Sequence, residues 1–399
     1  MFTKAYIPFR GYYSSPFAKW QGTLSTEHSL KLGAQTAARW FADKGWDPKQ
    51  FDYLYLGYTI HQKQAFYGAP WVAGMIGAEE VPGCNVSQAC STSTTCLYYA
   101  AAGLESGAMG HVLTLMTDRC SNGPHVLWPN PLGPGGQMVA EDWVMENFSR
   151  DPFAKNAMIQ TAENVAKEIG VTKEECDELT AIRYEQYTKA LENDRAFQRR
   201  YMFPVEVRVS KKKTLTLEAD EGIIPTDREA LAKLPPVLQG GVHSFGAQTH
   251  PADGNCAVVV TSRDRARELS ADPGVEIQIV SYGFARVRRG FMPMAPVPAA
   301  RMALERAGIT IDQVAALKTH NPFVVNDIYF AREFGIDPAR ANNYGSPLIF
   351  GHPQGPTAGR CVIEMIEELV EKGGGYGLFT GCAAGDTGAA LVVKVDSKG

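Results

Sequence analysis

The sequence of 399 residues has no excess of basic residues, since 39 Lys and Arg stand against 43 Asp and Glu. Without an excess of positive charge, the protein as a whole does not attract a polyphosphate electrostatically, so nucleic acid is not expected as a partner. No stretch approaches the roughly 18 consecutive apolar residues of a membrane-spanning helix. Residues 1–15 interleave Lys4 and Arg10 with aromatics instead of forming an apolar signal segment. We therefore expect a cytoplasmic protein with no membrane partner.

The eight cysteines include no CxxC pair. Thiols scattered over a long chain argue against both a disulfide framework and a structural zinc site, so we expect free thiols and no metal. With 45% hydrophobic and 21% charged residues, the composition is that of a globular protein. The length predicts two domains or one duplicated fold.

Two parts of the sequence repeat the same order of predicted elements. AARWFADKGWDPKQFDYLYLGYT begins at Ala37, and AARMALERAGITIDQVAALKTHN begins at Ala299, an offset of about 262 residues. Each reads as an amphipathic helix, a turn with glycine and an apolar strand. A second helix and a second strand follow in each part, at 91–106 and 111–118 and again at 355–372 and 377–381. Strands at 4–9 and 275–287 begin the two parts. The pattern predicts two related α/β halves.

Residues 119–240 interrupt this symmetry and are richer in charge, proline and glycine. They contain a Pro/Gly-rich loop at 123–137 and a strongly periodic helix at 172–193. A long insertion into a symmetric fold is suited to covering an active site, and a solvated insertion without such a role is the alternative. The predicted division is a first half at 1–118 that continues at about 241–270, a cap domain at 119–240, and a second half at 271–399.

Cys90 stands at the predicted start of a helix, in QACSTSTTC. Unpaired amides and the helix dipole at such a place favour the thiolate and lower the thiol pKa, which predicts a nucleophile. A small buried hydrophobe is the alternative. In the second half the equivalent position holds His352, in FGHPQGPTAGR. If the halves pack about a pseudo-twofold axis, His352 approaches Cys90 and is placed to act as its base.

Two more candidates follow strands of the second half. His320 ends the strand ALKTH, and Cys382 follows the strand GLFTG. Ligands of open α/β sheets bind beyond the carboxyl ends of strands. The recurrence of such residues at equivalent strand ends predicts one constellation of Cys90, His352, His320 and Cys382.

Five ordered motifs resemble those of the thiolase family over nearly the whole chain. They are SQACSTST around Cys90, TAENVAKEIGVTKEECDELTAIRYEQYTKAL at 161–191, HPADGNCAVVV at 250–260, GHPQG around His352, and GCAAGDTGAA around Cys382. The resemblance implies a five-layered α/β/α/β/α thiolase fold with an inserted loop domain, and a homodimer or dimer of dimers. It also implies coenzyme A as co-substrate with no permanently bound cofactor.

The resemblance further implies roles in cleaving a 3-ketoacyl-CoA. Cys90 attacks the keto carbon and keeps the acyl group when the bond between C2 and C3 breaks, and coenzyme A then removes that group. His352 activates Cys90, and Cys382 protonates the departing carbanion or removes the C2 proton in synthesis. His320 stabilises the enolate oxygen, and the backbone amides of Cys90 and Ala384 form a second oxyanion site.

Departures from the common thiolase pattern bear on substrate and partners. His320-Asn321-Pro322-Phe323 stands where many thiolases have Asn-Glu-Ala-Phe, and it is similar to sterol-carrier-protein-x and archaeal thiolases. The archaeal type commonly works with a small zinc-ribbon and OB-fold protein, which adds such a subunit as a candidate partner. Ala157-Met158-Ile159 replaces the usual His-Met-Gly, which disfavours a short acetyl substrate.

The contacts with coenzyme A follow from the same resemblance. Ser244, Gly246 and Thr249 fall on the loop that cradles pantetheine in the family, although SFGAQT departs from the usual TAGNAS. Met158 is assigned to the same ligand. Cations for the nucleotide phosphates are expected in the loop domain, where a solvated charged face is the alternative. The candidates are Arg195, Arg199, Arg200, Lys211, Lys212 and Lys213.

The acyl group is predicted from Arg119 and the loop at 123–137. An arginine suits a free carboxylate, whereas His125 and Trp128 suit a flat ring. With Phe323 as a further contact, these residues predict benzoylsuccinyl-CoA, cleaved to benzoyl-CoA and succinyl-CoA as in anaerobic toluene degradation. An ordinary ion pair is the alternative for Arg119.

Several alternatives to this function stay open. Within the class they are a sterol side-chain, branched or other aliphatic 3-ketoacyl-CoA, and acetyl transfer between acetyl-CoA molecules. Outside it they are a ketoacyl synthase and a non-catalytic thiolase-like scaffold. Cys382 argues against a synthase, because decarboxylating condensation generates its own carbanion and needs no such acid. A scaffold predicts the loss of a catalytic position, and none is lost.

Overall fold

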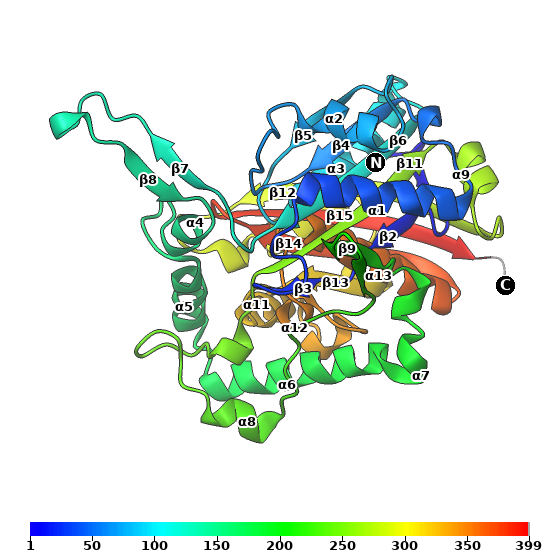
Figure 1. Cartoon of the computed structure of the whole chain (residues 1–399). Coiled ribbons are helices and arrows are strands. Elements are labelled where there is room, and N and C mark those ends of the chain that lie inside the picture. The colour runs from blue at the N-terminus through cyan, green and yellow to red at the C-terminus, as the bar shows by residue number, and fades with distance from the viewer. Residues whose placement is uncertain (398–399) are drawn as a thin grey trace.

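The computed structural model describes residues 1–397 (Figure 1). One mixed sheet of eleven strands runs through the molecule, and its two parts meet at β1 (Tyr6–Ile7), which pairs antiparallel with β11 and with β12. Besides β1, the first part contains β11 (Ala252–Thr261), β6 (His111–Arg119), β4 (Tyr53–Gly57) and β5 (Gly83–Val86), with β2 (Tyr12–Ser14) and β3 (Ala18–Lys19) paired to β11. The second part contains β12 (Val275–Arg286), β15 (Thr387–Ser397), β14 (Gly374–Ala383) and β13 (Val314–His320).

Alternating side chains of the first part of the sheet enter two different cores, as the pleat of a strand requires. In β6, Leu113 and Leu115 pack with the outer helices α1 (Ser29–Lys44) and α2 (Gly68–Met75). Val112 and Met116 face the opposite way and join the core shared by both halves. The first half therefore has one helical layer on each face of its strands.

The second part of the sheet is covered in the same way. Leu378 and Val392 pack with the outer helices α10 (Pro296–Ala307) and α11 (Val325–Phe334), whereas Phe379 and Val393 face the shared core. Between the two parts of the sheet lie α3 (Thr92–Ser106) and α13 (Gly355–Glu371), which contact each other. The predicted five-layered α/β/α/β/α architecture is confirmed.

The central helix α13 is buried on almost every side and carries charged residues into the core. Arg360 donates to both carboxylate oxygens of Asp220 at 2.6 and 2.8 Å and to Glu364 at 3.0 Å. A buried charge needs such a partner, because its removal from water is otherwise unfavourable. Asp220 belongs to the inserted segment, so this ion pair fastens that segment to the centre of the molecule.

The inserted segment forms short elements around one long helix, α6. The helix predicted at 172–193 ends earlier, because Asn193 and Asp194 have φ values of 51° and 56°, in the left-handed region that ends a helix. Figure 1 shows a hairpin of β7 and β8 that extends away from the rest of the molecule. The elements are β7 (His125–Trp128), β8 (Val139–Asp142), α4 (Met145–Ser149), α5 (Met158–Ile169), α6 (Lys173–Ala190), α7 (Glu192–Arg195), β9 (Val205–Ser210), β10 (Lys213–Leu217) and α8 (Arg228–Lys233).

Two short helices complete the described chain, α9 (Arg263–Leu269) and α12 (Pro347–Phe350). None of the helices within residues 1–397 combines the length and the apolar character needed to cross a bilayer. All eight cysteines are free, which confirms the prediction of free thiols.

Candidate active site

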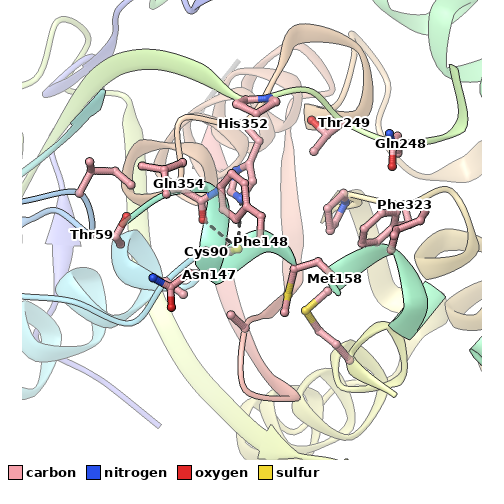
Figure 2. A pocket seen from close by; sticks show the side chains of 18 of the residues that line it. Thr59, Cys90, Asn147, Phe148, Met158, Gln248, Thr249, Phe323, His352 and Gln354 are labelled. Atoms are coloured by element: carbon pink, nitrogen blue, oxygen red, sulfur yellow. Dashed lines mark hydrogen bonds between the residues drawn. The ribbon is translucent and has the colours of Figure 1, made fainter. Parts of the chain in front are cut away.

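The loops that precede the two central helices bring Cys90 and His352 together. Cys90 lies just before α3, and His352 lies just before α13. The Sγ atom of Cys90 is 3.1 Å from Nε2 of His352 and 3.4 Å from Oε1 of Gln354 (Figure 2). The two residues are 262 positions apart, the same offset that relates the repeated segments of the sequence.

His352 is oriented by a hydroxyl group at the start of α13, the helix that follows it. Its Nδ1 atom lies 2.6 Å from Oγ1 of Thr357, one turn into α13. Burial lowers the pKa of His352 well below its usual value of 6.5, and the neighbouring His320 adds to the fall, so the imidazole is neutral. In the tautomer that donates the Nδ1 proton to the Thr357 hydroxyl, Nε2 is free to accept the proton of the Cys90 thiol.

The Cys90 thiol is protonated in this site. Burial raises its pKa to about 12, although the backbone N–H groups of Ala384 and of Cys90 itself oppose the rise. The sequence led us to expect a lowered pKa at the start of α3, and that expectation is wrong. Two amides at a helix start do not offset the removal of a thiolate from water. Nε2 of His352, 3.1 Å away, is within reach of the thiol proton.

His320 and Cys382 come from adjacent parallel strands behind Cys90, where His320 of β13 is opposite Gly381 of β14. The ring centroid of His320 lies 4.2 Å from that of His352, and burial lowers the pKa of His320 to about 3. The Cys382 Sγ accepts a hydrogen bond from Asn326 at 3.1 Å. Burial raises the pKa of Cys382 well above its usual value, and the nearby Cys90 adds to this rise.

A cavity of about 480 Å³ opens over Cys90. The inserted segment and the second half supply most of its walls, and Figure 2 shows Phe148, Met158 and Phe323 around the space in front of the sulfur. Among the described residues that line it, none is Arg, Lys, Asp or Glu. The larger apolar side chains of the lining are Ile60, Trp143, Val144, Phe148, Met158, Ile159, Val237, Met292 and Phe323, and the polar side chains include Thr59, Asn147, Gln248, Thr249 and Gln354.

Models of known families match both halves of the chain. The thiolase N-terminal domain matches residues 11–264, and the thiolase C-terminal domain matches residues 275–395. The chain belongs to the thiolase family. Thiolases are acyltransferases that use coenzyme A as a substrate and keep no permanently bound cofactor, so the predicted fold, enzyme class and co-substrate are confirmed.

Individual thiolases resemble the chain along nearly all of its length. The acetyl-CoA acetyltransferase of Pseudomonas aeruginosa is 29% identical over 380 residues, which cover 94% of this chain and 96% of that protein. The human mitochondrial 3-ketoacyl-CoA thiolase is 26% identical over 386 residues, covering 95% and 96%. The crystal structure of the Bacillus anthracis acetyl-CoA acetyltransferase has a TM-score of 0.90 at 25% identity and covers 99% of both chains. That of the human mitochondrial 3-ketoacyl-CoA thiolase in complex with CoA has a TM-score of 0.88 at 25% identity, covering 98%.

The residues assigned to coenzyme A fall into two groups in this thiolase. Met158 and Thr249 line the cavity, and Ser244 and Gly246 lie close to Thr249 on the loop before β11. The basic candidates do not line the cavity within the described part of the chain. Arg195 donates to the backbone carbonyl of Glu218, Arg199 pairs with the exposed Asp194, Arg200 pairs with Glu367, and Lys211 to Lys213 lie at the exposed turn between β9 and β10.

Three of the four residues assigned to an aromatic acid substrate are not brought to the cavity. The Arg119 guanidinium donates to the backbone carbonyl oxygens of Glu27 at 2.6 Å and Asn122 at 2.9 Å. These hydrogen bonds hold the guanidinium against the backbone and away from the cavity. His125 and Trp128 lie on the exposed β7–β8 hairpin. Of the assigned substrate contacts only Phe323 lines the cavity, and its aromatic companions there are Trp143 and Phe148. Local sequence placed Arg119 at a strand end but did not show which way its side chain turns.

Three polar residues of the site were not singled out from the sequence. Gln354, beside the Cys90 sulfur, stands inside the GHPQG motif, so the motif itself was a signal for it. Thr357 follows one turn later and holds His352. Asn326, the donor to Cys382, had no signal in the sequence, because its contact depends on the packing of α11 against β14.

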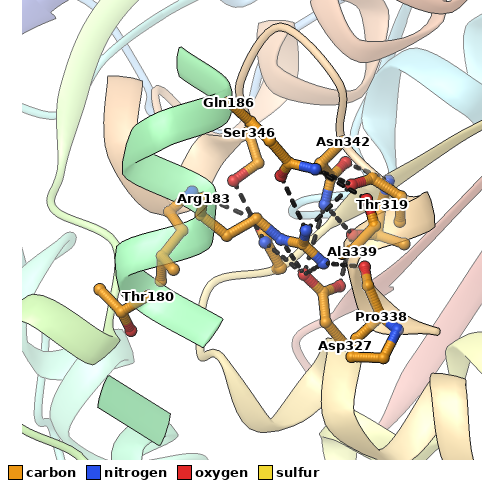
Figure 3. Close-up of polar contacts among 12 residues, drawn as sticks. Thr180, Arg183, Gln186, Thr319, Asp327, Pro338, Ala339, Asn342 and Ser346 are labelled. Atoms are coloured by element: carbon orange, nitrogen blue, oxygen red, sulfur yellow. Dashed lines mark hydrogen bonds and ion pairs between the residues drawn. The ribbon is translucent and has the colours of Figure 1, made fainter. Parts of the chain in front are cut away.

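A buried polar network supports the loop after His320 from the side of the inserted segment (Figure 3). The Nε of Arg183, on α6, donates to Oδ2 of Asp327, on α11, at 2.9 Å, and the guanidinium also donates to carbonyls of the loop 338–341. Asp327 in turn accepts a hydrogen bond from the Asn321 side chain at 2.7 Å. Because Asn321 follows His320, this network ties α6 to the strand end that carries His320.

We expect Arg183→Met to lower the free energy of unfolding by about 3–5 kcal/mol, because the buried Asp327 carboxylate loses its cation. The matched control is Arg228→Met, whose partners Glu178 and Glu185 are exposed, and it should cost less than about 1 kcal/mol. Urea denaturation at one protein concentration measures both. Equal losses in the two variants would contradict the role given to the Arg183 pair.

Proposed function

We propose that this thiolase cleaves a 3-ketoacyl-CoA with a bulky, apolar acyl group through an acyl-enzyme on Cys90. The observation that carries the proposal is the 3.1 Å contact between the Cys90 sulfur and Nε2 of His352 at a cavity with apolar and aromatic walls. A neutral base, a protonated thiol and a space for an apolar group are what the first step of thiolysis requires.

The first half-reaction forms the acyl-enzyme. His352 accepts the Cys90 proton, and the sulfur attacks C3 of the substrate. The amides of Cys90 and Ala384, which face this sulfur, stabilise the negative oxygen that develops at C3. The bond between C2 and C3 then breaks, its electron pair moves to C2, and a ring N–H of His320 stabilises the resulting enolate oxygen. Cys382 donates its proton to C2, which releases the shortened acyl-CoA.

The second half-reaction restores the site. The thiol of coenzyme A gives its proton to the Cys382 thiolate, and its sulfur attacks the thioester carbon on Cys90. The Cys90 sulfur leaves and recovers its proton from His352, so both cysteines are thiols again, and the proton that Cys382 gave to C2 is replaced by that of coenzyme A. The raised pKa of Cys382, caused first by burial, suits this role, because the thiol keeps its proton until a carbanion forms beside it.

The acyl group is proposed from the walls of the cavity. Met158 and Ile159, whose replacement of the usual motif disfavours a short acetyl substrate, line the cavity. Trp143 and Phe148 of the inserted segment line it as well. Burial of apolar surface contributes roughly 25 cal/mol per Å², which favours a large apolar group over an acetyl group. A free carboxylate on the substrate, such as that on the C2 arm of benzoylsuccinyl-CoA, meets no cation among the described lining residues. Benzoylsuccinyl-CoA therefore ranks behind an uncharged aromatic or branched analogue.

A substrate panel tests the proposal. Acetoacetyl-CoA, a long 3-ketoacyl-CoA, benzoylacetyl-CoA and benzoylsuccinyl-CoA are incubated with coenzyme A and the purified protein, and products are identified by mass spectrometry. We expect kcat/KM for an uncharged bulky substrate to exceed that for acetoacetyl-CoA by about tenfold or more, as a hydrophobic pocket discriminates. The benzoyl pair differs mainly by the carboxylate arm, so it isolates the effect of charge.

Each other outcome has a defined meaning. A preference for acetoacetyl-CoA contradicts the bulky acyl group, and a preference for benzoylsuccinyl-CoA over benzoylacetyl-CoA contradicts the uncharged pocket. In the latter case the cation comes from outside these walls, and the assay is repeated with any small protein that co-purifies. Absence of cleavage with every substrate, with and without such a protein, overturns thiolysis and favours a synthase or a scaffold.

A further inference from the structure

The side chains of Cys90, His320 and His352 bring together donor atoms that suit a metal ion. One sulfur and two imidazole nitrogens lie within 4.8 Å of one another. Among residues 1–397 this is the one group of three or more His, Cys, Asp or Glu side chains whose donor atoms converge in this way. A thiolate with neutral imidazoles favours zinc and similar transition metals over magnesium or calcium.

His320 provides an independent indication of a ligand. Its side chain is 1% exposed, and neither ring nitrogen has a hydrogen-bond partner among the described residues. A buried imidazole without partners is unfavourable unless a ligand satisfies it. In the proposed reaction an enolate oxygen does so only briefly, whereas a bound cation would do so continuously.

His352 is already oriented as metal-binding histidines commonly are. One ring nitrogen, Nδ1, is held by Thr357 at 2.6 Å, and the other, Nε2, lies 3.1 Å from the Cys90 sulfur. A hydrogen bond to the distal nitrogen sets the direction of the ring and leaves the second nitrogen for the metal.

We propose that Cys90, His320 and His352 together bind one Zn²⁺ ion and that the bound ion inhibits the enzyme. As the bond between sulfur and zinc forms, the Cys90 thiol releases its proton to solvent, and the coordinated sulfur no longer attacks a substrate. Three protein ligands leave one tetrahedral position open. Cys90 and His352 both line the cavity, so water occupies that position from the cavity side.

Zinc binding at this site does not depend on the proposed thiolysis, whereas the inhibition rests on Cys90 being its nucleophile. The three donors come from three separate elements, and Cys90 and His352 are 262 positions apart. Metal sites recognised from sequence are built on short spacings such as CxxC. The expectation of no metal site followed from the lack of such spacings, and it says nothing about donors that only the fold brings together.

The first test measures how much zinc the protein binds and requires no activity assay. The protein is equilibrated with ZnCl₂, desalted and analysed by inductively coupled plasma mass spectrometry. We expect about one zinc per chain in the parent and in Cys84→Ser, since Cys84 is a partly exposed free thiol outside the cluster. Cys90→Ser and His320→Asn should each retain at least tenfold less. Cobalt in place of zinc should give a sulfur-to-metal charge-transfer band that Cys90→Ser lacks.

A second measurement needs no variant. Zinc should slow alkylation of Cys90 by iodoacetamide in the parent at least tenfold, as read from the Cys90 peptide by mass spectrometry, and a chelator should restore the rate. Equal zinc content in the parent and in a folded His320→Asn, or unprotected Cys90 at saturating zinc, overturns the proposal. Neither measurement uses a substrate, so a failure of the zinc proposal can be distinguished from a failure of the thiolysis proposal, which the substrate panel tests.

Discussion

Cys90→Ser should lower kcat/KM for thiolysis by about 10⁴-fold or more and abolish the acyl-enzyme, because the substitution removes the sulfur nucleophile. A serine hydroxyl at this place gives up its proton far less readily than a thiol, and the neutral His352 is a weak base. The sulfur lies at the cavity, 3.1 Å from His352, so the similar-sized serine leaves the packing intact.

Two measurements check this result. Steady-state cleavage of the best substrate gives kcat/KM, and intact-protein mass spectrometry after incubation with acyl-CoA detects the bound acyl group. Cys84→Ser is the matched control, and it should keep full activity because Cys84 is a free thiol outside the cavity lining. Thiolysis by Cys90→Ser at the parental rate would remove Cys90 from the role of nucleophile.

Cys382→Ala should separate the two chemical steps. We expect cleavage of the carbon–carbon bond to fall by about 10²–10⁴-fold, the usual contribution of a positioned acid or base. Acylation of Cys90 by a simple acyl-CoA should fall far less, because no proton is needed at C2 and coenzyme A can leave as a thiolate without the Cys382 proton. The structure supports the distinction, since Cys382 is held by Asn326 at 3.1 Å, whereas Cys90 is paired with His352.

Rapid quenching followed by mass spectrometry resolves the two steps. A simple acyl-CoA reports acylation alone, and a 3-ketoacyl-CoA reports acylation together with bond cleavage. The control is Cys361→Ala, which deletes an equally buried thiol on α13 and should leave both rates unchanged. Unimpaired thiolysis in Cys382→Ala would refute the acid role, and loss of both steps would assign Cys382 to packing.

Burial sets the protonation states on which both predictions rest. Burial protonates both cysteines, raising the pKa of Cys90 to about 12 and that of Cys382 well above its usual value. The same burial keeps His352 neutral, so proton transfer from Cys90 to His352 must accompany attack on the substrate. Activation therefore lies in the contact between two neutral groups, and no preformed thiolate is needed.

The duplicated architecture and the meeting of Cys90 with His352 could be predicted from the amino-acid sequence. The offset of about 262 residues relates the two halves, and the same offset separates Cys90 from His352. Local patterns are sufficient for this, because helix and strand periodicities recur in both halves and the polar residues stand at corresponding element ends. The small-residue and glycine motifs around Cys90, His352 and Cys382 indicated the family for the same reason.

Only the tertiary structure decided the protonation state of Cys90 and the composition of the acyl cavity. The pKa of Cys90 depends on how much water distant segments exclude, and no pattern around residue 90 records that quantity. Arg119 turns to the carbonyls of Glu27 and Asn122, while Trp143 and Phe148 close the cavity. The direction of a side chain at the end of an element is set by its packing against segments far away in the sequence, and the folded chain alone brings those segments together.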